Sequence, residues 1–100
     1  MARAVVKRDG REEIFYPDKL KDALEKACKS AGLSEERIKE VITKVAAVTI
    51  AFVDTEDLVT SQQIRDMIFS ELERLGEKRV IEAWEKFEEE KRKKREAQGL

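Results

Sequence analysis

The feature that most constrains the fold of this chain is a single predicted hairpin in front of an otherwise helical pattern. Two β-prone stretches, residues 3–7 and 12–16, flank a short segment that contains Asp9 and Gly10. An Asp-Gly dipeptide between two such stretches is a strong short-range signal for a β-hairpin. Because an isolated hairpin is at best marginally stable in water, these strands must pack on the rest of the chain.

The register of this hairpin has two alternatives. A two-residue turn pairs Val5 with Ile14, whereas a three-residue loop over residues 8–10 pairs Val5 with Glu13. The choice matters, because a shift of one residue exchanges the two faces of a strand. The three-residue loop needs a left-handed glycine as its last residue. It places four side chains on one face of the hairpin: Val5, Lys7, Glu13 and Phe15.

Four segments with apolar residues at helical spacing follow the hairpin. They cover residues 17–31, the stretch from Ser34 to an acidic loop at 54–59, the stretch from a cap at Thr60 or Ser61 to Gly76, and the stretch from about Glu77 onward. Each has one apolar stripe, so we expect a mainly α (α+β) fold in which the hairpin lies as a lid on a four-helix bundle. We assign residues 1–92 to one domain and residues 93–100 to a charged tail.

Composition excludes several function classes. The 21 basic and 22 acidic residues give a net charge of -1, so no basic field covers the whole protein and any anion site must be local. With no histidine and only Cys28, the chain has neither an intrachain disulfide nor the usual zinc ligands. It has no Gly-rich phosphate loop and no nucleophile motif, so we expect no enzyme activity. No apolar run is long enough to span a membrane, and we expect a cytoplasmic protein.

One basic cluster remains as a candidate site. Lys7, Arg8 and Arg11 surround the predicted turn, and Lys19 and Lys21 follow at the start of the first helix. The cluster is either a solvated charged surface or a small phosphate pocket, where lysine and arginine donate charge-assisted hydrogen bonds. Local spacing does not decide between these two interpretations.

The hairpin residues resemble the start of the ATP-cone domain. This domain occurs at the N-terminus of many ribonucleotide reductase large subunits and in bacterial repressors of ribonucleotide reductase genes. The family pattern is roughly Val-x-Lys-Arg-(Asp or Asn)-Gly-(Arg or Ser)-x-Glu-x-(Phe or Ile), then a helix with an early lysine, and residues 5–15 and Lys19 match it. Residues 59–64 are similar to the start of the family's third helix. The resemblance covers residues 5 to about 75 and favours the three-residue loop.

The resemblance implies regulatory binding of ATP or dATP beneath the hairpin, with magnesium arriving on the nucleotide. Lys7, Arg8 and Lys19 would bind phosphates, and Glu13 would accept hydrogen bonds from the adenine amino group or the ribose. The other candidates are Val5, Phe15 and Leu20 as walls of the adenine site, Thr60 or Ser61 as donors, and Tyr16 and Arg65, whose types differ from those expected at their positions. The bound nucleotide would control self-association or a partner, such as a ribonucleotide reductase or a transcription regulator.

The sequence departs from the family in its fourth helix, where many ATP-cones carry a Tyr-x-Arg-aromatic-Ala run and this chain has residues 80–84 instead. No catalytic domain follows within the 100 residues, so we expect either a stand-alone cone or a piece of a longer protein. An alternative hypothesis is an interaction protein that binds no nucleotide and uses the basic residues 91–95 to contact nucleic acid or an acidic partner. Four glutamates bracket that stretch and argue against contact with nucleic acid.

Overall fold

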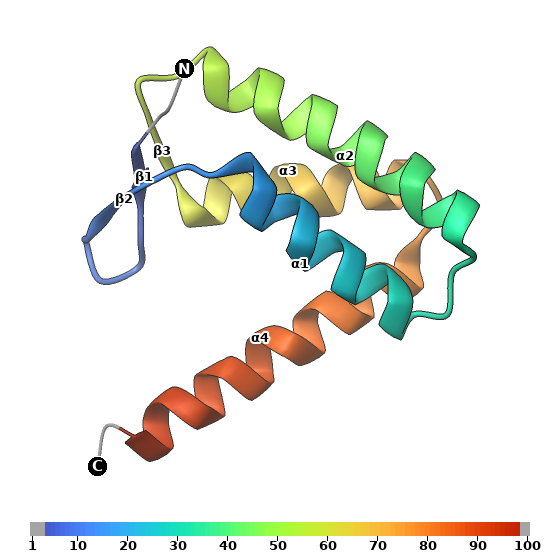
Figure 1. Ribbon diagram of the computed structural model, residues 1–100. Coiled ribbons are helices and arrows are strands. Elements are labelled where there is room, and N and C mark those ends of the chain that lie inside the picture. The colour runs from blue at the N-terminus through green and yellow to red at the C-terminus, as the bar shows by residue number, and fades with distance from the viewer. Residues whose placement is uncertain (1–3, 99–100) are drawn as a thin grey trace.

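The computed structural model describes residues 4–98, so Arg3 of the first expected strand and the end of the expected tail lie outside the described residues. The elements in chain order are β1 (Ala4–Val6), β2 (Glu12–Ile14), α1 (Pro17–Ser30), α2 (Glu35–Asp54), β3 (Leu58–Thr60), α3 (Ser61–Arg74) and α4 (Lys78–Gln98). Figure 1 shows the small sheet at one end of the helices, with α4 running below α1. The predicted mainly helical α+β fold is confirmed.

The sheet has three strands in the order β2-β1-β3, one more than the expected hairpin. β1 pairs antiparallel with β2 and parallel with β3, which places Val59 beside Val5. The expectation of an acidic loop over residues 54–59 is therefore wrong at both ends, because Asp54 ends α2 and Leu58 begins β3. A parallel pair joins segments that are distant in sequence, so the local pattern around residue 58 does not reveal it.

Local capping explains where the helices begin. α1 begins at Pro17, whose restricted φ angle suits the first helical position. Before α2, the Ser34 hydroxyl accepts a hydrogen bond from the Arg37 backbone N–H at 3.2 Å. Before α3, Thr60 and Gln63 cap one another: the Thr60 hydroxyl accepts from the Gln63 N–H at 3.0 Å, and the Gln63 side-chain oxygen accepts from the Thr60 N–H at 2.9 Å. The capping residues predicted from the sequence are thus confirmed, and the choice between Thr60 and Ser61 falls on Thr60.

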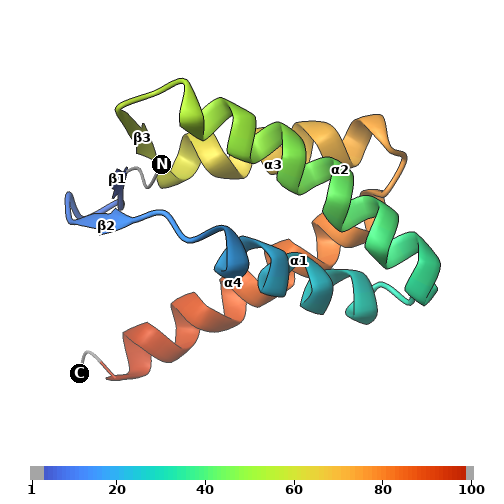
Figure 2. The same cartoon turned by 45° about the horizontal axis from the view of Figure 1, so that its top comes forward.

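The helices bury one main core. α1 packs against α2 and α4, and α3 packs against the same two helices (Figures 1 and 2). The largest fully buried apolar side chains of this core are Leu24, Val41, Val45, Ile68, Leu72 and Val80. The apolar stripes of the sequence include these positions. The stripe of the first helix also includes Ala23, which is exposed, and the stripe of the second left open Val48 or Thr49, of which Thr49 is buried.

A second, smaller apolar cluster attaches the sheet to the helices. Val5 and Val59 pack with Val53 from the end of α2, and Phe15 and Ile64 lie against both this cluster and the main core. The cluster anchors one end of the hairpin beside the start of α3. The turn of the hairpin, which has no buried residue, extends beyond it.

Candidate functional site

The hairpin closes with the three-residue loop. Val5 lies opposite Glu13, the Lys7 N–H donates to the Arg11 carbonyl at 2.8 Å, and Gly10 has a φ of +88°. Asp9 braces the loop by accepting hydrogen bonds from the backbone N–H and Nε of Arg11, at 3.0 and 2.7 Å. These bonds, the backbone one first, lower the pKa of Asp9. The register favoured by the family resemblance is therefore confirmed.

This register puts Val5, Lys7, Glu13 and Phe15 on one face of the hairpin, which we call the inner face. Its end near the helices is apolar, because Val5 is buried and Phe15 is half-buried against the cluster that Val5 forms with Val53 and Val59. Its end near the turn is charged, with the Lys7 ammonium 3.6 Å from a Glu13 carboxylate oxygen. A ligand with an apolar ring and anionic groups would match this division.

The start of α1 supplies a further cation. The Lys19 ammonium lies 5.2 Å from the centre of the Tyr16 ring, and both side chains are exposed. Such a cation–π contact at an exposed site is weak, at about 0.5–1 kcal/mol, so Lys19 can move to an anionic ligand. Leu20, by contrast, is only 7% exposed within the main core and offers a ligand little surface.

The start of α3 brings three more candidates to the same end of the molecule. Thr60 is the exposed cap, and Ser61, the first residue of α3, is half-buried. Arg65 lies one turn later and is engaged with α4: its Nε donates to both carboxylate oxygens of Glu88, at 2.9 and 3.1 Å. Arg65 also lies 3.6 Å from a Glu85 oxygen, and these carboxylates raise its pKa.

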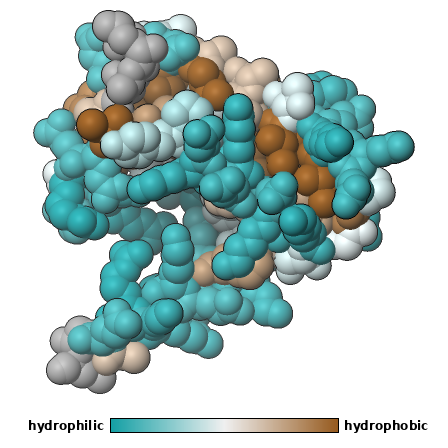
Figure 3. Space-filling view, viewed as in Figure 1, coloured by the Kyte–Doolittle hydropathy of each residue, from teal (hydrophilic) through white to brown (hydrophobic). Residues whose placement is uncertain are grey.

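The partner of Arg65 is the part of the site that sequence reasoning missed. Glu88 lies 23 residues away on another helix, and no local spacing connects the two residues. Figure 3 shows the surface hollowed between the body of the molecule and the outer part of α4, with hydrophilic side chains on both sides. Arg65 and Glu88 join α3 to α4.

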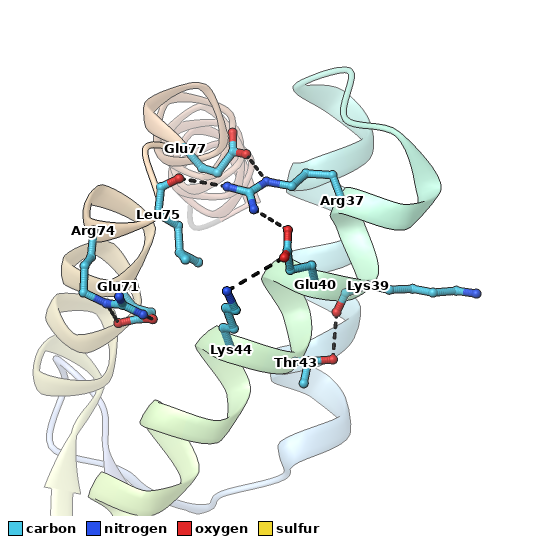
Figure 4. Close-up of polar contacts among 9 residues, drawn as sticks. All are labelled: Arg37, Lys39, Glu40, Thr43, Lys44, Glu71, Arg74, Leu75 and Glu77. Carbon is cyan, nitrogen blue, oxygen red and sulfur yellow. Dashed lines mark hydrogen bonds and ion pairs between the residues drawn. The ribbon is translucent and has the colours of Figure 1, made fainter.

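A separate polar network determines where α4 begins. Arg37 of α2 donates to the Glu77 carboxylate at 2.6 Å and to the Leu75 carbonyl at 2.8 Å, and it also pairs with Glu40 (Figure 4). Glu77 directly precedes α4 and is buried, and its backbone carbonyl accepts from the Val80 N–H at 3.1 Å. The network therefore ties the connection between α3 and α4 to α2, at the end of the molecule away from the sheet (Figure 1).

The basic stretch 91–95 lies on the exposed outer part of α4. Arg92 is bound within its own helix, to Glu89 and to Glu96, at 2.6 Å each. This pairing lowers the pKa of Glu89 and reduces the local positive charge. The outer part of α4 is thus a mixed-charge surface.

One further surface feature shares only Lys21 with the basic cluster predicted from the sequence. An open, apolar hollow of about 320 Å³ lies between α1 and α2, lined by Lys21, Ile42, Thr43, Ala46, Ala47 and Ile50. None of the eleven site residues predicted from the sequence lines it. Within residues 4–98, no group of side chains has the composition and spacing of a metal site.

Among the described helices, none combines the length and the apolar character needed to cross a bilayer.

Comparison with known proteins identifies relatives of this chain. Residues 3–93 match the family model of the ATP cone domain. The transcriptional repressor NrdR of Synechococcus sp. (strain CC9311) is 32% identical over 73 residues, which are 73% of this chain and 45% of the relative. NrdR of Synechococcus sp. (strain RCC307) is 34% identical over 77 residues, or 77% and 47% of the two chains. The chain thus spans less than half the length of these curated relatives.

Proposed function

The chain belongs to the ATP-cone family of nucleotide-binding regulatory domains, and from that premise we propose that ATP or dATP binds against the inner face of the hairpin. The observation that carries the proposal is the hairpin register, which combines an apolar end and a charged end on one face. The adenine would lie against Phe15, with the nearly buried Val5 and Leu20 behind it. The triphosphate would lie toward the turn and the start of α1.

The charges near the turn suit a triphosphate. Lys7, Arg8 and Lys19 provide three cations, and within residues 4–98 Arg8 has no ion-pair partner. Lys7 is paired with Glu13 across 3.6 Å, and Glu13 also lies 3.9 Å from Arg11. A phosphate would take over Lys7 and leave a Glu13 oxygen to accept a hydrogen bond from the adenine amino group or the ribose. Charge-assisted bonds of this kind contribute about 1.5–3 kcal/mol each.

Groups at the start of α3 and on α1 complete the proposed site. The Thr60 hydroxyl accepts its capping bond but retains its proton, so it can still donate to the nucleotide, as can Ser61. Tyr16 lies beside Lys19 and would border the site. Magnesium would be held by phosphate oxygens and water, as is usual for this ion.

The regulatory output would be a change in association. We propose that the nucleotide alters either the assembly of this chain with itself or its binding to a partner, such as a ribonucleotide reductase or a transcription regulator. The relatives are transcriptional repressors, which supports a transcription regulator as the partner. A regulatory ligand must bind one state more tightly than another, so assembly has to be measured with and without nucleotide.

The test is calorimetric titration with Mg-ATP and Mg-dATP, with the molecular mass followed by light scattering. The double variant Lys7→Ala/Arg8→Ala should lose about tenfold or more in affinity, because it removes two charge-assisted donors. Lys29→Ala/Lys39→Ala is the matched control. It removes the same charge from exposed positions, and the Lys39 side chain points away from its neighbours in Figure 4. An equal loss in both double variants, or no binding of either nucleotide by the unmodified chain, would refute the proposed site.

A further inference from the structure

Arg65 is held by α4 in a way that leaves little room for another anion. Its Nε donates to both oxygens of Glu88, at 2.9 and 3.1 Å, and a terminal nitrogen lies 3.6 Å from Glu85. The guanidinium also lies 4.3 Å from the centre of the Phe69 ring, and the side chain is 26% exposed. Glu88 thus occupies the position from which an acceptor oxygen of a ligand would contact Arg65 Nε.

The position of Arg65 connects it to the proposed nucleotide site. Arg65 follows Ser61 by four residues on α3, so the two side chains lie on the same face of the helix. The residue before Arg65, Ile64, packs beside Val5 and Phe15 of the inner face. Arg65 therefore lies within the first two turns of the helix that borders the inner face.

Glu88 is also the last residue of α4 that is not exposed. Val80, Ile81 and Ala83 are buried, Phe87 and Glu88 are half-buried, and residues 89–98 are all exposed. Two contacts hold the helix near this point: Arg65 with Glu88, and the Lys26 ammonium 4.4 Å from the centre of the Phe87 ring. Beyond them α4 extends as an arm away from the body (Figures 1 to 3).

We propose that Glu88 is an internal competitor of the nucleotide for Arg65, and that nucleotide binding detaches Glu88, at the base of the arm formed by residues 89–98, from α3. The proposal rests on the proposed function. One guanidinium cannot make the same Nε bond to Glu88 and to an acceptor oxygen of the nucleotide, so that oxygen has to displace the carboxylate. Because the Arg65–Glu88 pair has to be broken on binding, the intact pair lowers the affinity for nucleotide, and by linkage the nucleotide weakens this pair by the same factor.

Release would change the arm itself. A helical segment of this length is marginal in water without packing, even with the pairs that Arg92 makes to Glu89 and Glu96. Once Glu88 is free, residues 89–98 would fray or reorient. A mixed-charge surface whose order depends on the nucleotide is a means of controlling association with another chain.

The test uses Glu88→Gln, which removes the charge but keeps the size of the side chain, with Glu89→Gln as the matched control. Glu89 is paired with Arg92 within the arm and does not contact α3. We expect Glu88→Gln to bind Mg-ATP about three- to fivefold more tightly, the range expected for a partly exposed ion pair. Hydrogen exchange of amides 88–98 should be faster in Glu88→Gln without nucleotide and in the unmodified chain with Mg-ATP.

The outcomes separate the two proposals. If the unmodified chain binds Mg-ATP but Glu88→Gln matches Glu89→Gln in affinity and in exchange, the competition is refuted and the proposed function stands. If the unmodified chain binds neither nucleotide, the proposed function fails and the competition fails with it. In Glu88→Gln the amide oxygen still offers Arg65 a hydrogen-bond acceptor. Glu88→Ala removes this acceptor as well, and it should show the same changes as Glu88→Gln.

Discussion

We expect the removal of the Thr49 hydroxyl to stabilise the protein. Thr49 lies in the middle of α2, is fully buried, and its Oγ1 has no hydrogen-bond partner among the described residues. A buried polar group without a partner costs about 1–3 kcal/mol. Valine has the same branched shape and a similar helix propensity, so Thr49→Val removes this cost with little change in packing or in the helix. We expect the free energy of unfolding to rise by about 1 kcal/mol.

The measurement is urea and thermal unfolding followed by far-ultraviolet circular dichroism. For a domain of this size, 1 kcal/mol corresponds to a rise in Tm of about 4–8 °C. Thr43→Val is the matched control on the same helix, because the Thr43 hydroxyl is exposed and donates to the Lys39 carbonyl at 2.8 Å. The control should not gain stability. A loss of stability in Thr49→Val would mean that the hydroxyl is satisfied in solution, by a water molecule or a helix carbonyl, and would refute the reasoning.

Two further predictions concern the cap of α3 and the cysteine. Thr60→Ala should lower the free energy of unfolding without nucleotide by about 1 kcal/mol, because it removes the capping bond. Ser61→Ala should change this free energy little. Equal effects of the two variants in urea unfolding would contradict the capping role of Thr60. Burial raises the pKa of the Cys28 thiol from an ordinary 9.0 to about 11, so in the folded protein the thiol should react with a disulfide reagent only through unfolding. Rapid labelling of the native protein by the reagent would contradict the burial of Cys28. Since the folded-state pKa is the higher one, the stability linked to Cys28 is complete below pH 9.0 and is lost as the pH rises toward about 11.

Much of the fold could be predicted because its signals are local. The Asp9-Gly10 dipeptide indicates a reversal of the chain, and the positive φ of Gly10 is a conformation that glycine adopts without strain. The choice of register, however, came from the family resemblance, since both turns are compatible with the dipeptide. Ser34 and Thr60 cap their helices through neighbours three residues away, so their roles could be predicted from spacing alone.

The predictions about the fold that were wrong concern residues whose conformation or burial depends on distant segments of the chain. Leu58 and Val59 look like part of a polar connection, and they form a strand because β1 offers them a free edge. Ala23 fits the apolar stripe of α1 but lies beyond the helices that cover it. The hydrophobic pattern shows which face of a helix is apolar, whereas the neighbours decide how far the burial extends.

In the candidate site, too, local relationships could be predicted from the sequence, whereas contacts between distant residues could not. Val5, Lys7, Glu13 and Phe15 could be assigned to one face from the sequence, because side chains alternate along a strand. The engagement of Arg65 could not, because its partner Glu88 is contributed by another helix.

By itself, the sequence determined the family of this protein, the number and approximate limits of its helices, and the residue types of its proposed nucleotide site. These follow from interactions between residues a few positions apart. Only the tertiary structure decided that a third strand completes the sheet, that Thr49 rather than Val48 is buried, and that Arg65 is bound to α4. Each depends on contacts across many residues, whose geometry is set when the helices pack together.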